Sequence, residues 1–215
     1  MPDELTKVII LGAAGTGLMM AETIRRSEQF TLAGLLDDDP EKQVRGYEDH
    51  EVLGPLDCWK DLPDDWLFLS SLYGPKHNTH FADVVERLAI PIERWAVVID
   101  PTAIVAPSVQ VAGGAFIGPA CVVEPESQLG PWTALLGSVH VAHHARLGSY
   151  VACANRVSLC GGVEVGRAAF LGAGSCVREY IRIGPRAIVG LGSVVVRDVA
   201  EDTTVAGNPA RPLAT

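Results

Sequence analysis

The chain has 215 residues, of which 48% are hydrophobic and 22 are glycine, and its formal net charge is −9 at pH 7. The acidic balance argues against nucleic acid as a partner. No apolar run approaches the roughly 20 residues that span a bilayer, the first residues lack a signal-peptide pattern, and the five cysteines include no CxxC pair. We therefore expect a cytoplasmic protein with reduced thiols.

The first stretch predicts a strand, a glycine turn and a helix. The apolar run 7–11 predicts a buried strand, and a helix is expected over 18–26. Backbone N–H groups at the start of such a helix can hold a phosphate. The turn between them supplies the candidate binding residues Gly12, Ala14, Gly15 and Thr16. Its spacing is GxxGxG rather than GxGxxG, so a plain tight turn remains the alternative.

A second strand is expected over 31–36, and it ends in Asp37 and Asp38. An acid at this place can accept a hydrogen bond from a ribose or a base; an acidic turn before Pro40 is the alternative. Further strands over 66–71 and 95–99 and a helix over 80–88 complete half of a doubly wound sheet. The domain boundary is expected near residue 100, which gives domains 1–100 and 101–215.

From Val105 to Val195 every sixth residue is aliphatic, with Cys153 as the exception. A fixed period of six is typical of a parallel β-helix, in which each hexapeptide makes a short strand and a corner. Residues two apart in a strand point the same way, so these positions and those two before them fill the interior. The fold class is therefore a small Rossmann-like α/β domain followed by an all-β parallel β-helix.

Three histidines lie together in the middle of the repeat: His140, His143 and His144. Because Val141 points inward, His143 and His144 are expected at the following outward corner. Histidine titrates near neutrality and can accept a proton; it is also a common zinc ligand, and an outward histidine can simply be solvated. The metal reading resembles the left-handed β-helix carbonic anhydrases, whose other site residues are not evident here, so we expect no metal.

Taken together, these elements resemble the PglD/NeuD-type nucleotide-sugar acetyltransferases, which have a small Rossmann-like domain followed by a left-handed β-helix. The resemblance covers essentially the whole chain. It is carried by the turn 12–17, by Asp37 and Asp38, by the hexapeptides, by the segment around His143 and by the segments 170–174, 189–195 and 207–211.

The resemblance implies transfer of acetyl from acetyl-CoA, the co-substrate, to a sugar amine by direct attack in a ternary complex. The amine is typically the 4-amino group of a nucleotide-linked aminodideoxy sugar. His143 maps onto the base, with His144 beside it, and the nucleotide is expected at the turn, at Asp37 and Asp38 and at Ser71. CoA is expected between subunits of a homotrimer, at positions that map onto Ala152, Gly161, Gly172, Ala173, Leu191 and Arg211.

Four positions depart from the family pattern. His144 stands where the family usually has an acid, Leu136 where it often has Asn, and Ala152 where it often has His, and the third strand lacks its G-[DN]. Two alternatives therefore stay open: a sialic-acid-type sugar O-acetyltransferase, and a non-catalytic nucleotide-sugar-binding trimer. The trimer would be helped by small outward residues, for which we take Ala142, Ala152, Ala154 and Ala168. The tail 198–215 is expected to be a loop that presents Arg211.

Overall fold

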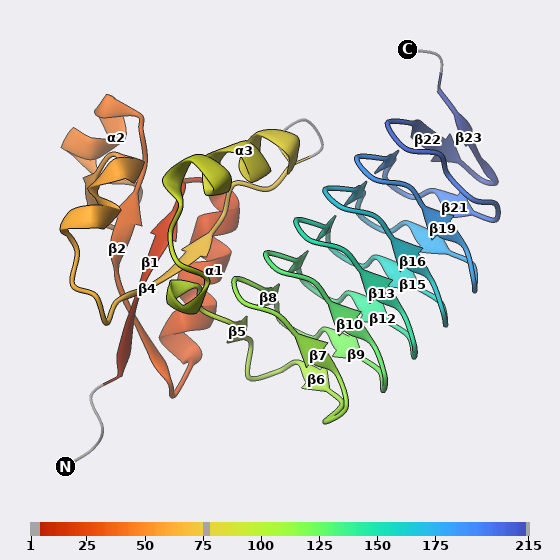
Figure 1. Cartoon of the computed structure of the whole chain (residues 1–215), viewed down its shortest axis with the longest axis horizontal. Helices are drawn as coiled ribbons and strands as arrows, with labels where there is room; N and C mark the ends of the chain where they lie inside the picture. Colours follow the sequence, from red (N-terminus) through yellow and green to blue (C-terminus); the bar gives the residue numbers. More distant parts are fainter. Residues whose placement is uncertain (1–4, 75–77, 214–215) are drawn as a thin grey trace.

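The computed structural model describes residues 5–74 and 78–213. Its N-terminal part is a parallel sheet in the order β3-β2-β1-β4, with helices packed around it (Figure 1). The strands are β1 (Thr6–Leu11), β2 (Phe30–Leu36), β3 (Val52–Gly54) and β4 (Leu67–Ser70). Residues 8–11 of β1 and 68–69 of β4, the two strands at the middle and one edge of this order, are fully buried, as in a parallel sheet covered on both faces. The small α/β domain is thus confirmed.

The helices differ from the expected ranges at their starts. They are α1 (Gly15–Arg26), α2 (Pro40–Arg45) and α3 (Asn78–Leu88), with 3-10 helices η1 (Leu56–Asp61) and η2 (Ile92–Arg94). Helix α1 begins three residues earlier than the expected range, because the glycines belong to its first turn. Helix α2 was not predicted, although Asp39 caps it by accepting the N–H of Glu41 and Pro40 opens it, a typical helix start.

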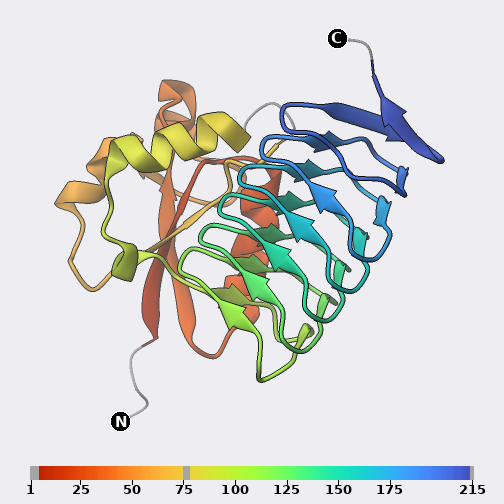
Figure 2. The same ribbon diagram turned by 45° about the vertical axis from the view of Figure 1, so that its right-hand side comes forward.

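Residues 98–207 form a β-helix of triangular coils (Figures 1 and 2). Each strand pairs in parallel with the strand 18 residues further along, for example His140 with Ser158, so three hexapeptides make one coil. The expected inward positions are buried from Ile117 to Val195, and each buried aliphatic side chain contributes about 1.5–3 kcal/mol. The predicted β-helix is confirmed.

The coils stack into three faces. The polar face contains β7 (Gln110–Val111), β10 (Gln128–Leu129), β13 (Arg146–Leu147), β16 (Glu164–Val165) and β19 (Arg182–Ile183). The apolar face contains β6 (Ile104–Val105), β9 (Val122–Val123), β12 (His140–Val141), β15 (Ser158–Leu159), β18 (Cys176–Val177) and β21 (Val194–Val195). The domain face contains β5 (Val98–Ile99), β8 (Phe116–Ile117), β11 (Ala134–Leu135), β14 (Ala152–Cys153), β17 (Phe170–Leu171) and β20 (Ile188–Val189).

The two parts meet on the domain face and on the corners that lead into it. Trp95 continues the first sheet by pairing with Phe68, whereas Val98–Ile99 pairs with β8 of the β-helix. A single strand over 95–99 was therefore wrong, because the chain crosses between two sheets there. The ring of Trp95 lies edge-on to Trp132, at 5.7 Å between centroids, and Trp132 stacks on Tyr150 at 4.7 Å.

A polar contact joins the same two parts. Asp100, at the start of the β-helix, accepts a hydrogen bond from Thr23 Oγ1 at 2.9 Å and another from the guanidinium of Arg26. Both donors lie on α1, and the carboxyl of Asp100 is fully buried. Buried carboxylates need such partners, so this contact fixes the crossing point between the sheets.

The expected tail loop is instead an antiparallel hairpin. Its strands are β22 (Thr204–Gly207), which extends the domain face, and β23 (Ala210–Pro212). Arg211 lies on β23 and is exposed, as expected. None of the helices in the described part of the chain has the length and apolar character of a transmembrane span.

Candidate functional site

His143 lies at the corner where the apolar face turns into the polar face. It follows β12 and precedes β13, and its side chain is exposed. The next residue, His144, has φ 59°, which places it in the left-handed region where non-glycine residues are uncommon. The outward position predicted for both histidines is therefore what the coil produces.

Three polar contacts hold this corner. The backbone N–H of His143 donates to Glu124 Oε2 at 3.0 Å. The ring Nδ1 of His143 lies 3.1 Å from Nδ1 of His144. The two imidazole planes are nearly perpendicular, at 87°. Glu124 belongs to the preceding coil, and its other oxygen, Oε1, lies 2.8 Å from Nε2 of His140. The three histidines are thus connected through one carboxylate and one ring-to-ring contact.

Glu124 is the acid that the sequence analysis did not find. The hydrogen bond from His140 and then the backbone N–H of His143 hold the pKa of this carboxyl below its usual value. The 18-residue period could have located it, because residue 124 is one coil before residue 142 and therefore lies beside it. A carboxylate thus adjoins the histidine corner even though the residue after His143 is not acidic.

Gly161 lies one coil after His143, and the imidazole of His143 packs against it. A Cβ at Gly161 would stand 2.6 Å from Cε1 and 2.8 Å from Nε2 of His143, closer than real Cβ contacts allow. The missing side chain therefore lets the ring rest on the main chain. Of the residues proposed for CoA, this is the one that the structure brings to His143.

The other residues proposed for CoA lie elsewhere in the protomer. Gly172, Ala173 and Leu191 occupy the opposite edge of the apolar face, where Leu191 is 81% exposed. Ala152 is on the domain face and only 1% exposed, so its side chain offers little contact to a ligand in the isolated protomer. Gly161 and Leu191 thus lie on the two opposite edges of the apolar face.

The predicted nucleotide residues divide into two groups. In the first, Ser71 Oγ donates to the carbonyl of Gly12 at 2.6 Å, and Asp37 Oδ2 accepts from the N–H of Ala13 at 2.7 Å. Asp37 is also 3.1 Å from Lys42 Nζ. Gly12 itself has φ 95°, which favours glycine. These residues close the turn, so the acidic-turn alternative describes Asp37 well.

The second group, which consists of Ala14, Gly15 and Thr16, remains accessible to a ligand. Ala14 and Gly15 are exposed, and a Cβ at Gly15 would meet nothing within 4 Å. Helix α1 starts here without a side-chain cap on its N–H groups. Thr16 is on the same turn. The turn adjoins a cavity of about 230 Å³, which is lined by Gly12, Asp37, Asp38, Leu56, Leu72, His80, Val84 and Arg87.

Asp38 and two residues of α3 shape that cavity. Asp38 Oδ1 accepts the N–H of Leu56 at 2.8 Å, and its Oδ2 is 3.7 Å from Arg87. Arg87 also bonds Asp57 at 2.8 Å. His80 and Arg87 were missed by the sequence analysis, because nothing in the sequence says which side of α3 faces the glycine turn.

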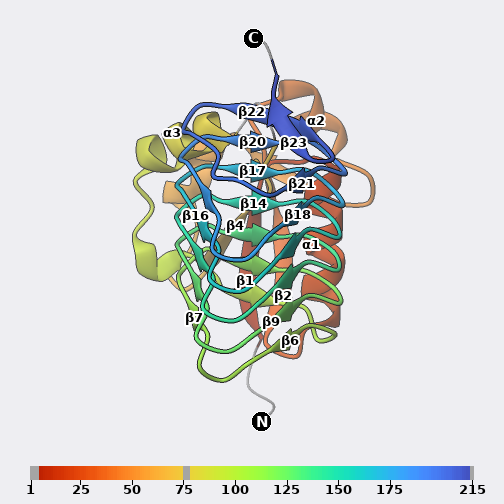
Figure 3. The same cartoon turned by 90° about the vertical axis from the view of Figure 1, so that its right-hand side faces the viewer.

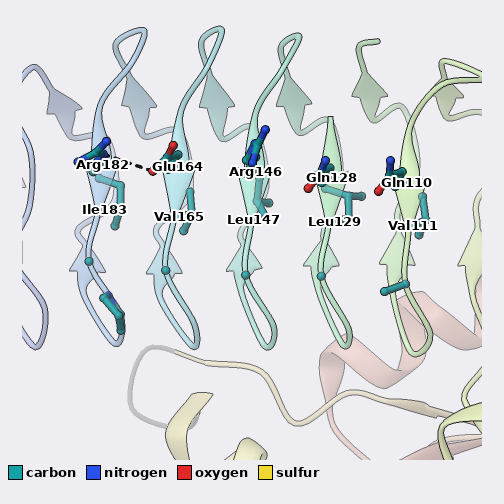
Figure 4. A pocket seen from close by; sticks show the side chains of 16 residues that line it. Gln110, Val111, Gln128, Leu129, Arg146, Leu147, Glu164, Val165, Arg182 and Ile183 are labelled. Atoms are coloured by element: carbon teal, nitrogen blue, oxygen red, sulfur yellow. Dashed lines mark ion pairs between the residues drawn. The ribbon is translucent and has the colours of Figure 1, made fainter. Parts of the chain in front are cut away.

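A larger groove, of about 730 Å³, runs along the polar face toward its edge with the domain face, where Gly130, Gly148 and Gly166 line it. Figure 4 shows Gln110, Gln128, Arg146, Glu164 and Arg182 side by side in a row, one from each successive coil. Glu164 and Arg182 form an ion pair at 3.3 Å. The groove presents amide, guanidinium and carboxylate groups, which suit a ligand rich in hydroxyl groups.

The histidine corner and the glycine turn lie on opposite sides of the prism. The edge between the apolar and polar faces is opposite the domain face, on which the N-terminal part is packed. Figure 3 shows the N-terminal part behind the coils, with the apolar and polar faces toward the viewer. Within one protomer the domain face therefore lies between the two candidate sites.

Comparison with known proteins agrees with this architecture. Residues 7–68 match the model of the PglD N-terminal domain. Curated relatives are acyl-[acyl-carrier-protein]–UDP-N-acetylglucosamine O-acyltransferases. That of Alkalilimnicola ehrlichii is 43% identical over 86 residues, which are 40% of this chain and 33% of that protein. That of Burkholderia thailandensis is 36% identical over 78 residues, which are 36% of this chain and 30% of that protein. The chain thus spans about a third of the length of the curated relatives it matches.

Solved structures match nearly the whole chain. PerB from Caulobacter crescentus, in complex with CoA and GDP-perosamine, has a TM-score of 0.86 at 26% identity and covers 98% of this chain and 99% of its own. The acetyltransferase domain of PglB from Neisseria gonorrhoeae, in complex with acetyl coenzyme A, has a TM-score of 0.85 at 25% identity, with 98% and 100% covered. The fold and the site define a hexapeptide-repeat left-handed β-helix protein with a Rossmann-like N-terminal domain. Its N-terminal part matches the PglD N-terminal domain and its whole length matches the PerB and PglB acetyltransferase structures, which confirms the resemblance seen in the sequence.

Proposed function

We propose that this protein transfers the acetyl group of acetyl-CoA to the amine of a nucleotide-linked amino sugar. The observation that carries the proposal is an exposed imidazole, that of His143, held on a glycine of the next coil beside a carboxylate, in a fold that matches sugar acetyltransferases over its length. The structures that match include variants of the Caulobacter enzyme in which one histidine is replaced by asparagine or alanine.

In this mechanism the sugar amine attacks the thioester carbonyl directly. The new C–N bond forms as the C–S bond breaks, His143 accepts the proton that the amine loses, and the CoA thiolate leaves and is protonated. His143 is suited to the proton transfer because histidine titrates near neutral pH, and such help is worth about 10²–10⁴ in rate. The C-4 amino group is the acceptor we propose, following the family resemblance.

The nucleotide is proposed to lie at the cavity beside Gly15, with the diphosphate on the first turn of α1 and Asp38 and Arg87 at its rim. Helix N-termini favour phosphate. The sugar would then extend into the groove of the polar face, where Arg146 and Gln128 point outward. Since the domain face lies between the cavity and the histidine corner in one protomer, we propose that the two come from neighbouring subunits.

A homotrimer provides this arrangement. The apolar face presents small and aliphatic outward side chains, among them Ile104, which is 68% exposed. The residues that the sequence analysis chose for the subunit contact were mostly wrong: Ala142, Ala152 and Ala168 are all at most 8% exposed, and Ala168 packs in the cluster that contains Trp95. The apolar face is the better contact, and closed cyclic symmetry is the common solution for such a surface.

The same arrangement gives acetyl-CoA a place between subunits. The edge with His143 and Gly161 would come from one subunit, and the edge with Ala173 and Leu191 from its neighbour. Acetyl-CoA and nucleotide sugars are metabolites of the cytoplasm, which supports a cytoplasmic location.

The curated relatives favour O-acetylation of a sugar as the alternative function, because they are O-acyltransferases that act on a UDP-sugar. The test is to incubate the protein with acetyl-CoA and a panel of UDP-, GDP- and dTDP-linked amino sugars and to measure release of the CoA thiol. An acetylated product that resists hydroxylamine is an amide and supports N-acetylation; a labile one is an ester. If no panel member releases CoA while nucleotide sugars still bind, the non-catalytic trimer is the better description.

A further inference from the structure

The contact between His143 and His144 fixes where protons can lie, an inference that rests on the proposed function. Their Nδ1 atoms are 3.1 Å apart, which is hydrogen-bond distance. A neutral imidazole carries one N–H, so one ring donates from Nδ1 and the other accepts. If His143 donates, its Nε2 has a free lone pair; if His144 donates, Nε2 of His143 carries the proton and cannot accept one.

Glu124 decides between these two arrangements. Its Oε2 accepts the backbone N–H of His143, and its Oε1 is held by His140. The carboxylate therefore lies on the His143 side of the pair, where its interaction with a charge on His143 is favourable. A proton taken up by the pair is thus best accommodated on His143, and that requires its Nε2 to be the free nitrogen.

The hydrogen bond also strengthens during the reaction. Once Nε2 of His143 has taken the proton, the ring is an imidazolium and its Nδ1–H donates to a neutral acceptor. Hydrogen bonds from a charged donor are shorter and roughly twice as strong as neutral ones. A partner that gains strength only as the proton moves favours the transition state over the ground state.

We propose that His144 is a positioning residue whose Nδ1 accepts the Nδ1–H of His143, which leaves Nε2 of His143 as the proton acceptor. Glu124 completes the arrangement by fixing the main chain of His143 and facing the charge that forms there. Two groups from different coils thus share the task of orienting one base.

Two variants at residue 144 separate this role from a structural one. Asparagine and glycine both tolerate the left-handed backbone found there, so both variants should fold. His144→Asn keeps an acceptor oxygen near the place of Nδ1, whereas His144→Gly removes it. We expect His144→Asn to retain kcat within about threefold and His144→Gly to lose about tenfold, the size of one hydrogen bond, with the KM for acetyl-CoA unchanged in both.

Nitrogen NMR of histidine-labelled protein gives a readout that needs no substrate. In the wild type we expect His143 to be protonated at Nδ1 and free at Nε2, and in His144→Gly to shift toward protonation at Nε2. A wild-type His143 protonated at Nε2, or equal kcat in the two variants, would overturn the proposal. If no amino sugar is turned over but the NMR result holds, the proposed function fails and the positioning role stands.

Glu124→Gln tests the second group. Glutamine keeps an oxygen for the N–H of His143 but carries no charge, so kcat should fall about tenfold, the loss of one charge-assisted contact, and the NMR signals of His143 should show a smaller share protonated at Nδ1. A Glu124→Gln enzyme with wild-type kcat would show that the carboxylate charge is not used.

Discussion

The imidazole of His143 lies directly on the main chain of Gly161, in the space that a side chain at 161 would fill. Gly161→Ala must therefore push the ring away, and misplacing a catalytic group by about 1 Å can cost about 10²-fold in rate. We expect kcat for acetyl transfer to fall by about that factor with little loss of thermal stability, measured by steady-state kinetics and thermal unfolding.

Gly137→Ala is the matched control for this prediction. It lies at a corner on the other edge of the apolar face, and its added Cβ would be 3.5 Å from Asn155 Oδ1, an ordinary contact. Equal losses of kcat in the two variants would mean that alanine at any corner disturbs the coils, and that Gly161 has no special relation to His143.

Replacing His143 itself should separate chemistry from binding. His143→Ala is expected to lower kcat by about 10²–10⁴, the usual worth of a general base, and to leave the affinity for acetyl-CoA nearly unchanged. His144→Ala should cost less. Stopped-time assays of thiol release and calorimetry with acetyl-CoA check the two statements. The assignment is refuted if His143→Ala turns over normally, or if removal of His140 or His144 is more harmful.

The sequence predicted the repeat and the histidine corner better than it predicted contacts between distant residues. The six-residue period places His143 outward because inward and outward positions follow from the strand alone. By contrast, the hydrogen bond from Asp37 to the N–H of Ala13 depends on how a carboxylate folds back on a turn. The burial of Ala152 and Ala168 depends on where the N-terminal domain packs, which no local pattern contains.

Two glycines of the first turn should respond in opposite ways. Gly15→Leu places a side chain in open space, so the fold should keep its thermal stability while nucleotide-sugar affinity falls about tenfold, or about 1.4 kcal/mol. Gly12→Ala adds a Cβ 2.6 Å from Leu72 Cδ2 at a φ of 95° and should lower thermal stability instead. Calorimetry with nucleotide sugar and with acetyl-CoA distinguishes the cases; unchanged binding of both by Gly15→Leu would make the turn merely structural.

The buried carboxyl of Asp100 should make stability depend on acid. Burial raises its pKa, but the hydrogen bonds from Thr102 and Thr23 and the charge of Arg26 outweigh burial, so its pKa in the folded protein is lowered. The folded state then binds fewer protons than the unfolded state near pH 4, and this contribution to stability is present above that range and lost as the pH falls through the folded pKa.

Asp100→Asn is therefore expected to cost about 1–3 kcal/mol of unfolding free energy at pH 7 and progressively less below pH about 4. Denaturant unfolding at several pH values measures this difference. Asp202→Asn is the control, since Asp202 pairs with Arg186 on the surface and exposed pairs contribute little. If the unfolding free energy lost by Asp100→Asn stayed constant down to pH 2, the lowered pKa of Asp100 would be contradicted.

The opposite placement of the glycine turn and the histidine corner has a genetic consequence. If each active site combines the corner of one subunit with the turn of its neighbour, a chain damaged at His143 and a chain damaged at Gly15 each lack one half of every site. When the two impaired chains are co-expressed and assemble together, some boundaries in a mixed trimer join an intact corner to an intact turn. At a low concentration of nucleotide sugar such mixed assemblies should be more active than either parent, because the defects fall in different halves of a shared site.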